Sequence, residues 1–140
     1  NAGYIIDGQT TDAPILGVLN GIFYNAATTL KPTFANFYKQ PITPANSEDI
    51  DAFVFDNPQQ QYVVATDDSV AQSGYLETYD MNTSAGSTTT GKSSATLDIG
   101  DTSADAASFR LLRSAEDPEN DENAAFRSVV VCINLIELQS

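Results

Sequence analysis

The sequence predicts an all-β fold, a small β-barrel or sandwich of about eight short strands with long loops. Short segments rich in β-branched and aromatic residues recur along the chain and are separated by turn residues. Charged residues make up only 18% of the chain, and abundant Thr, Ser, Asn and Gln suit exposed strands better than solvated helices. A chain of 140 residues can bury one core but not two, so we expect residues 1–140 to form a single domain.

The individual strands follow from local composition and from the turn residues between them. Gly17 and Gly21 interrupt the second strand and predict a bulge or a sharp bend there. Asp56-Asn57-Pro58 is a turn between two strands, which we therefore expect to form a hairpin. The predicted strands lie at residues 3–6, 15–24, 51–55, 61–66, 96–99, 109–113 and 129–138, while 75–81 is ambiguous.

Three other segments complete this outline. Residues 129–138 are apolar on both faces at first, which predicts a central strand. Cys132 in that strand is the only cysteine, so no disulfide forms within the chain, and we expect it to act as a small buried hydrophobe. Residues 67–72 are expected to form one helical turn, and residues 82–94 a loop of Gly, Ser and Thr.

The charge balance limits the classes of partner. Six Lys and Arg face nineteen Asp and Glu, which gives a net charge of −13. Nucleic acid and anionic membranes attract clustered Lys and Arg, so we expect neither to be a partner. The acidity leaves a solubility role, a basic protein partner or a cation site. The sequence shows no signal-peptide or transmembrane pattern.

One segment matches a nucleotide-binding motif in full. Residues 86–93, GSTTTGKS, fit the P-loop pattern, in which Lys92 would reach the phosphates and Ser93 would bind magnesium. A P-loop needs a buried strand before it and a helix after it. The residues on both sides predict a loop and then an alternating strand, so we expect residues 86–93 to be a solvated loop.

Other catalytic and metal sites find little support. The chain has no His, which excludes a Ser-His-Asp or Cys-His arrangement and the usual zinc sites. Glu77 and Asp80 are expected on a solvated strand face and not as a catalytic carboxylate pair. Residues 117–123 could suggest a calcium loop but lack its Gly, so we expect an acidic surface loop. We therefore predict a protein that is not an enzyme and has no catalytic residues, cofactor or metal.

Aromatic residues in the first half of the chain allow two interpretations. Phe53 and Phe55 lie in a predicted strand, and either core packing or a partner-binding surface would explain them. Residues 31–44 combine Pro with aromatics in an irregular stretch, which can lie extended along a partner. The candidate capsid- or partner-binding residues in that stretch are Lys31, Pro32, Phe34, Phe37, Tyr38 and Pro41.

An ordered set of segments resembles a known family. The segments are 16–24, 31–38, 52–58, 67–70 and 86–91 with Leu97-Asp98, followed by Leu111-Leu112, Asn120 and 129–134. Together they resemble small virion proteins encoded beside the major capsid gene of marine and freshwater tailed phages. Members of that family carry an N-terminal segment before the strand that residues 3–6 resemble, so the resemblance implies that this chain lacks such a segment.

The resemblance also implies a function. It predicts a capsid decoration (cement) protein that binds the outer surface of the virion capsid and bridges subunits of the major capsid protein. It further predicts a homo-oligomer, a dimer or trimer, on the capsid lattice. The alternative is a carbohydrate- or cell-surface-binding module on the phage particle, with Tyr75 and Tyr79 as an exposed sugar platform.

Overall fold

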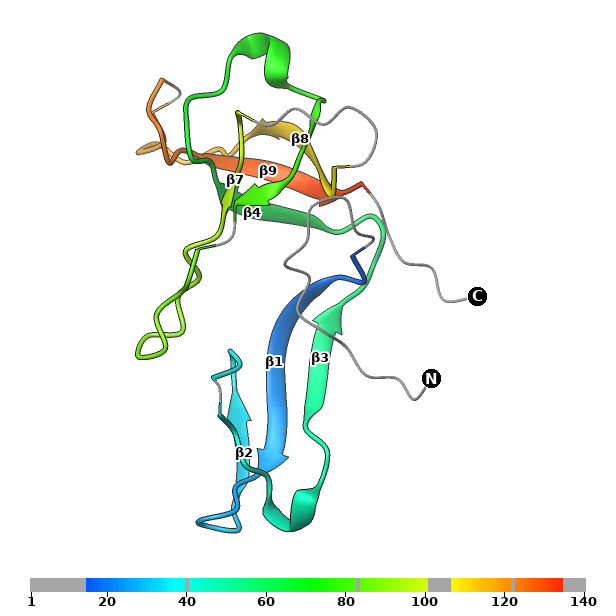
Figure 1. Ribbon diagram of the computed structural model, residues 1–140. Helices are drawn as coiled ribbons and strands as arrows, with labels where there is room; N and C mark the ends of the chain where they lie inside the picture. The colour runs from blue at the N-terminus through cyan, green and yellow to red at the C-terminus, as the bar shows by residue number, and fades with distance from the viewer. Residues whose placement is uncertain (1–14, 40, 83, 101–106, 122, 135–140) are drawn as a thin grey trace.

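The computed structural model describes residues 15–39, 41–82, 84–100, 107–121 and 123–134. These residues form an elongated molecule in which an arm, residues 18–60, projects from a body, residues 61–134 (Figure 1). The regular secondary structure of the described residues is nearly all β, as predicted, and their only helical segments are two short 3-10 turns. Neither turn is long and apolar enough to span a membrane.

The arm is a three-stranded antiparallel sheet in the order β2-β1-β3. Its strands are β1 (Val18–Asn25), β2 (Pro32–Ala35) and β3 (Asp51–Phe55), and the 3-10 turn η1 (Ala45–Ser47) precedes β3. The register between β1 and β3 shifts between Leu19 and Gly21, which confirms the predicted bulge. A Cβ on Gly17 would lie 2.0 Å from the carbonyl oxygen of Phe55, so only glycine allows this close approach of the two strands.

The body contains a four-stranded antiparallel sheet in the order β4-β9-β8-β5 and a two-stranded ribbon, β6-β7. The apolar strand β9 is central, as predicted, because β4 and β8 pair with its two edges. Another bulge lies in β8, between Leu111 and Arg113. The elements of the body are β4 (Gln61–Ala65), η2 (Gln72–Gly74), β5 (Thr78–Tyr79), β6 (Met81–Asn82), β7 (Thr96–Leu97), β8 (Phe109–Ser114) and β9 (Ser128–Ile133).

One hydrophobic core lies in the body, between the inner face of the sheet and the ribbon. Its buried members come from every layer: Val70, Tyr79, Leu97, Phe109, Leu111, Val129, Val131 and Ile133. Met81 from β6 packs against them, so the ribbon covers one face of the sheet as the second layer of a small sandwich. The sheets of the described residues do not close into a barrel.

Several local expectations were wrong. β3 and β4 do not form the predicted hairpin, although Gln60 N–H donates to Asn57 O in the turn between them (3.0 Å). β3 pairs with β1 in the arm and β4 pairs with β9 in the body, because each strand finds a longer apolar partner there. A second error is β2, a strand in a stretch expected to be irregular.

Two further expectations need correction. The helical turn expected at residues 67–72 is instead η2, a 3-10 turn that begins at Gln72. Cys132 is only half-buried, because it lies on the outer face of β9, opposite Gln61 of β4 and Arg110 of β8. The strand predicted at residues 3–6 and the end of the one predicted at 129–138 lie outside the described residues.

Candidate functional site

The most distinctive surface of the molecule is one face of the arm. Opposite residues of paired antiparallel strands point to the same side, and successive residues alternate. Phe23 lies opposite Phe34, and Val18 lies opposite Phe55. These pairings place five apolar side chains on one side of the sheet, here called the aromatic face: Val18, Phe23, Phe34, Phe53 and Phe55.

Gly21 makes the centre of the aromatic face possible. Gly21 lies on β1, opposite Phe53, and a Cβ there would lie 2.6 Å from Cζ of Phe34. The Phe34 ring therefore extends over the glycine from β2 toward β3. The ring centroids of Phe34 and Phe53 lie 6.1 Å apart at an interplanar angle of 41°, within the range of favourable aromatic pairs.

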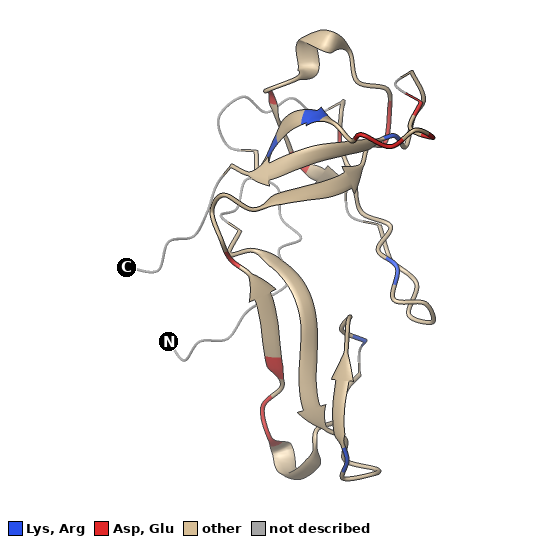
Figure 2. Cartoon of the chain, turned by 180° about the vertical axis from the view of Figure 1, so that it is seen from behind, with Lys and Arg blue, Asp and Glu red and all other residues tan. Residues whose placement is uncertain are grey.

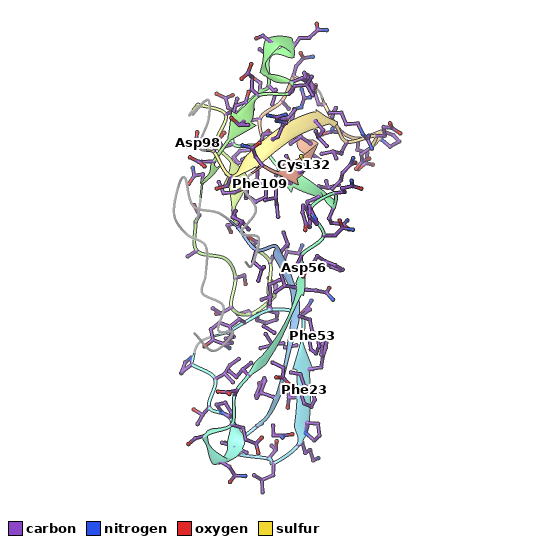
Figure 3. The ribbon with its side chains drawn as sticks, turned by 90° about the vertical axis from the view of Figure 1, so that its right-hand side faces the viewer. Phe23, Phe53, Asp56, Asp98, Phe109 and Cys132 are labelled. Atoms are coloured by element: carbon purple, nitrogen blue, oxygen red, sulfur yellow. The ribbon has the colours of Figure 1, made fainter. Side chains whose placement is uncertain are left out.

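Solvent reaches much of this aromatic face. Phe34 is 62% exposed, Phe53 48% and Phe55 50%. Given the size of an aromatic side chain, these three rings expose on the order of 300 Å² of apolar surface. Figure 3 shows Phe23 and Phe53 along the arm, beyond the four-stranded sheet of the body. The largest apolar patch on a typical monomer has about this size and is often functional.

The opposite face of the arm carries a groove of about 490 Å³. Tyr24 of β1 and Ala35 of β2 contribute from the sheet, since they alternate with Phe23 and Phe34. Residues 41–43 form the other wall, and Thr43 O accepts a hydrogen bond from Ala27 N–H (3.1 Å). The groove residues are Tyr24, Ala26, Ala27, Thr28, Ala35, Phe37, Lys39, Pro41, Ile42 and Thr43.

The six predicted partner-binding residues all lie on or beside β2, but the structure divides them between the two faces. Phe34 belongs to the aromatic face, while Phe37 and Pro41 line the groove. Lys31 and Pro32 lie at the start of β2, and Tyr38, which follows it, is 46% exposed. Phe53 and Phe55, for which core packing remained an alternative, are exposed on the aromatic face.

Charge separates the two edges of the arm. Lys31 and Lys39, two of the three lysines in the chain, lie on the two sides of β2 in the sequence, Lys31 directly before it and Lys39 in the segment after it. Figure 2 shows the basic positions of the arm in blue next to β2 and the acidic positions in red on the side of β3. Four carboxylates lie on the other side, in β3 and next to its ends. We call Lys31 and Lys39 the basic rim and Glu48, Asp49, Asp51 and Asp56 the acidic rim. The aromatic face therefore lies between edges of opposite charge.

The P-loop-like segment has a different architecture from a nucleotide site. Ser87 N–H donates to Lys92 O (2.9 Å) and Gly91 N–H donates to Ser87 O (2.8 Å), which closes the segment as a tight turn. Gly91 has a φ of +70°, and a Cβ there would lie 2.2 Å from Cδ1 of Phe37 in the arm. No helix follows within the described residues, and β7 begins at Thr96. The closed turn and the contact with Phe37 thus explain why residue 91 is a glycine, and no bound phosphate is needed for this explanation.

The acidic loop after β8 uses its carboxylates to shape turns. Asp117 Oδ1 accepts from Glu119 N–H (3.1 Å) and Asp121 Oδ1 accepts from Asn123 N–H (2.9 Å). One exposed ion pair, Arg113–Glu116 at 3.2 Å, joins the loop to β8. Among the described residues, no three Cys, Asp or Glu side chains lie together in a group that could hold a metal ion.

Two residues expected at the surface of the body are buried. Tyr79 is only 2% exposed and its hydroxyl donates to Gly74 O (3.0 Å), so it cannot form a sugar platform with Tyr75. Burial raises the pKa of Tyr79, and Glu77 raises it further. Asp80, expected on a solvated face, is buried and accepts a hydrogen bond from Ser108 N–H (3.2 Å).

Tyr75 has a structural partner of its own. The buried Arg127 donates a hydrogen bond to the Tyr75 hydroxyl, and its guanidinium lies 5.7 Å from the centre of the Tyr75 ring. This contact combines a hydrogen bond with a cation–π interaction. This pair has no signature in the sequence, because the two residues are 52 positions apart and no local pattern joins them.

The exposed features of the arm that are candidates for function are therefore the aromatic face, the groove behind it and the charged rims. Comparisons with protein-family models, with curated proteins and with solved structures found no match to this chain.

Proposed function

We propose that this chain is a structural protein that binds and reinforces a protein shell, as a capsid decoration (cement) protein of a tailed phage. The observation that carries the proposal is that one projecting arm has exposed aromatic side chains on one face and a groove on the other. A protein that bridges neighbours needs at least two binding surfaces. The sequence resemblance implies that this shell is an icosahedral capsid and that the partner is its major capsid protein.

Exposed aromatic surface supports a protein partner. Aromatic anchors dominate the energetics of protein interfaces, and they contribute most when they lie at the centre of a patch with a polar rim. Phe34 and Phe53 have this position, between the basic and the acidic rim. The net charge of −13 favours a protein over nucleic acid or an anionic membrane as the partner.

The proposed mechanism is mechanical and needs no reaction. A protein that binds the assembled shell but not its separate subunits stabilises the assembly by mass action. Many copies on a symmetric lattice strengthen a modest single contact through avidity. The expected location is the outer capsid surface of the virion, and no cofactor or metal takes part.

The test is to add the protein back to purified particles that lack it. Restored particles should release their genome at a higher temperature, because bound copies hold neighbouring subunits together. Ile42→Asp places a charge in the groove, and this variant should bind particles about tenfold more weakly or worse. Val63→Asp, an exposed position on the body, is the matched control and should bind normally. Particles that neither bind the protein nor gain stability from it would exclude the function.

A further inference from the structure

We infer that the aromatic face is the interface for a second copy of this chain, so that the arms of two copies pack face to face. The inference rests on the proposed function, because it names the partner of one of the two arm surfaces. It leaves the groove, on the opposite face, for the shell.

The charge of the arm supports a second copy as the occupant. The arm sheet has the order β2-β1-β3, with the basic rim along β2 and the acidic rim along β3. Two such sheets can pack face to face around a two-fold axis that runs parallel to the strands. This rotation places β2 of one copy over β3 of the other, so each basic rim faces the partner's acidic rim.

The position along the strands agrees with this arrangement. Asn25 pairs with Pro32, and its side-chain Nδ2 donates to Glu48 Oε2 (2.9 Å), so Lys31 and Glu48 lie near the same end of β1. A rotation about an axis parallel to the strands keeps that end of both copies together. Lys31 of one copy then lies near Glu48 of the other, and the symmetry repeats this contact.

The apolar area is of the right order for such a contact. A standard interface takes about 800 Å² from each partner. The three exposed phenylalanines supply on the order of 300 Å² of this, and the rims and the rest of the face are available for the remainder. Two sheets packed through their apolar faces with roughly aligned strands are a common arrangement, with about 10 Å between layers.

Sedimentation equilibrium of the full chain, without any shell, tests the dimer directly. The protein should reach a monomer–dimer equilibrium, and Phe53→Ala should raise the dissociation constant about thirtyfold or more, because each dimer loses two rings. Phe126→Ala is the matched control, since Phe126 is a 70% exposed ring on the body, and it should not change the dissociation constant. A protein that remains monomeric to about millimolar concentration, or a dimer that depends on Phe126, would overturn the inference.

Charge reversal tests the proposed symmetry. Lys31→Glu and Glu48→Lys should each weaken the homodimer about tenfold, because each variant brings like charges together twice. A mixture of the two variants should form a heterodimer of nearly normal affinity, since every opposed pair is then complementary again. Glu48→Gln controls for the lost contact with Asn25. A mixture that dimerises no better than the separate variants would exclude this geometry.

The dimer and the shell-binding function can fail separately. If the chain dimerises but does not bind particles, the proposed function is wrong and the inference about the face stands. If the chain is monomeric and Phe53→Ala reduces particle binding, the aromatic face contacts the shell itself and the second copy is the wrong occupant.

Discussion

At the scale of single residues, Gly21 decides whether the aromatic face can form. Gly21→Ala would place a methyl group 2.6 Å from the Phe34 ring and force that ring away from Phe53. Overpacking of this kind costs about 1–3 kcal/mol, and this cost lowers the free energy of local opening of the arm. The Ile22 amide in the arm should therefore exchange with solvent about tenfold faster. Gly100→Ala is the control, because its new Cβ would approach only Asp98, at 3.4 Å. Equal exchange in the two variants would contradict this role.

Asn120 has a comparable importance in the body. Its Nδ2 donates to Ser114 Oγ, Ala115 O and Ser128 O, and its Oδ1 accepts from Ser128 N–H (2.8 Å). Since a net hydrogen bond contributes about 0.5–1.5 kcal/mol, Asn120→Ala should lower the free energy of unfolding by about 2–3 kcal/mol in urea denaturation. The same change at Asn123, an exposed residue of the same loop, should have little effect. A loss no larger than that of Asn123→Ala would mean that water replaces these bonds.

Tyr79 predicts a loss of stability at high pH. Burial and Glu77 raise its pKa above the usual value near 10, so the folded chain keeps a proton that the unfolded chain loses. The contribution of this group is complete below about pH 10 and falls as the pH rises through the folded pKa. In denaturation measured as a function of pH, the free energy of unfolding should therefore fall more steeply at alkaline pH for the natural protein than for Tyr79→Phe. Parallel declines would show that Tyr79 ionises equally in both states.

At the scale of elements, the turn at residues 86–93 should depend on the arm. Gly91 contacts Phe37, and its φ of +70° disfavours other residues. Gly91→Ala should therefore detach the turn and make the bond after Lys92 more sensitive to trypsin, severalfold in the rate of cleavage. Phe37→Ala should have the same effect, whereas Thr89→Ala, at an exposed position of the turn, should not. Unchanged cleavage in both contact variants would show that the turn is held by its own hydrogen bonds.

Local composition predicts most elements of this fold but not how they pair. β1, β3, β4, β8 and β9 were expected from their composition, because β-branched and aromatic residues between turn signals are a local property. The pairing of β3 with β1 and of β4 with β9 is not local, and a short turn wrongly suggested a hairpin. β2 was missed because Pro32 and the nearby prolines obscure a four-residue strand.

The candidate site was predictable only in part, for a related reason. The stretch around β2 carried the correct residue types, so sequence alone could select it as a partner surface. The position of Phe34 on the aromatic face depends on strand register, and a shift of one residue would move it to the other face. Phe37 and Pro41 lie after β2 and line the groove. Asp80 and Tyr79 were misplaced because their burial depends on the distant Ser108 and on the β8–β5 pairing.

At the scale of the whole molecule, core residues are distributed unequally. The body contains the hydrophobic core, whereas Ile22 and Ala45 are the buried hydrophobic residues of the arm. We therefore expect the arm to open more easily than the body, with amides of β1 exchanging at least about tenfold faster than those of β9. Hydrogen exchange measured by mass spectrometry checks this difference, and dilution should increase it if the arms pair. Equal protection would mean that arm and body unfold as one unit.

Pro32, at the beginning of β2, limits how an assembly of these chains can grow. A three-stranded sheet with two open edges could add strands from further molecules in its own plane and become an endless fibril. Proline has no backbone N–H to offer an incoming strand, and β2 is only four residues long. Lateral recruitment is thus discouraged on that side, while contact through the flat aromatic surface is self-limiting. Such a chain could accumulate at high concentration in a cell before any shell exists, without forming fibres.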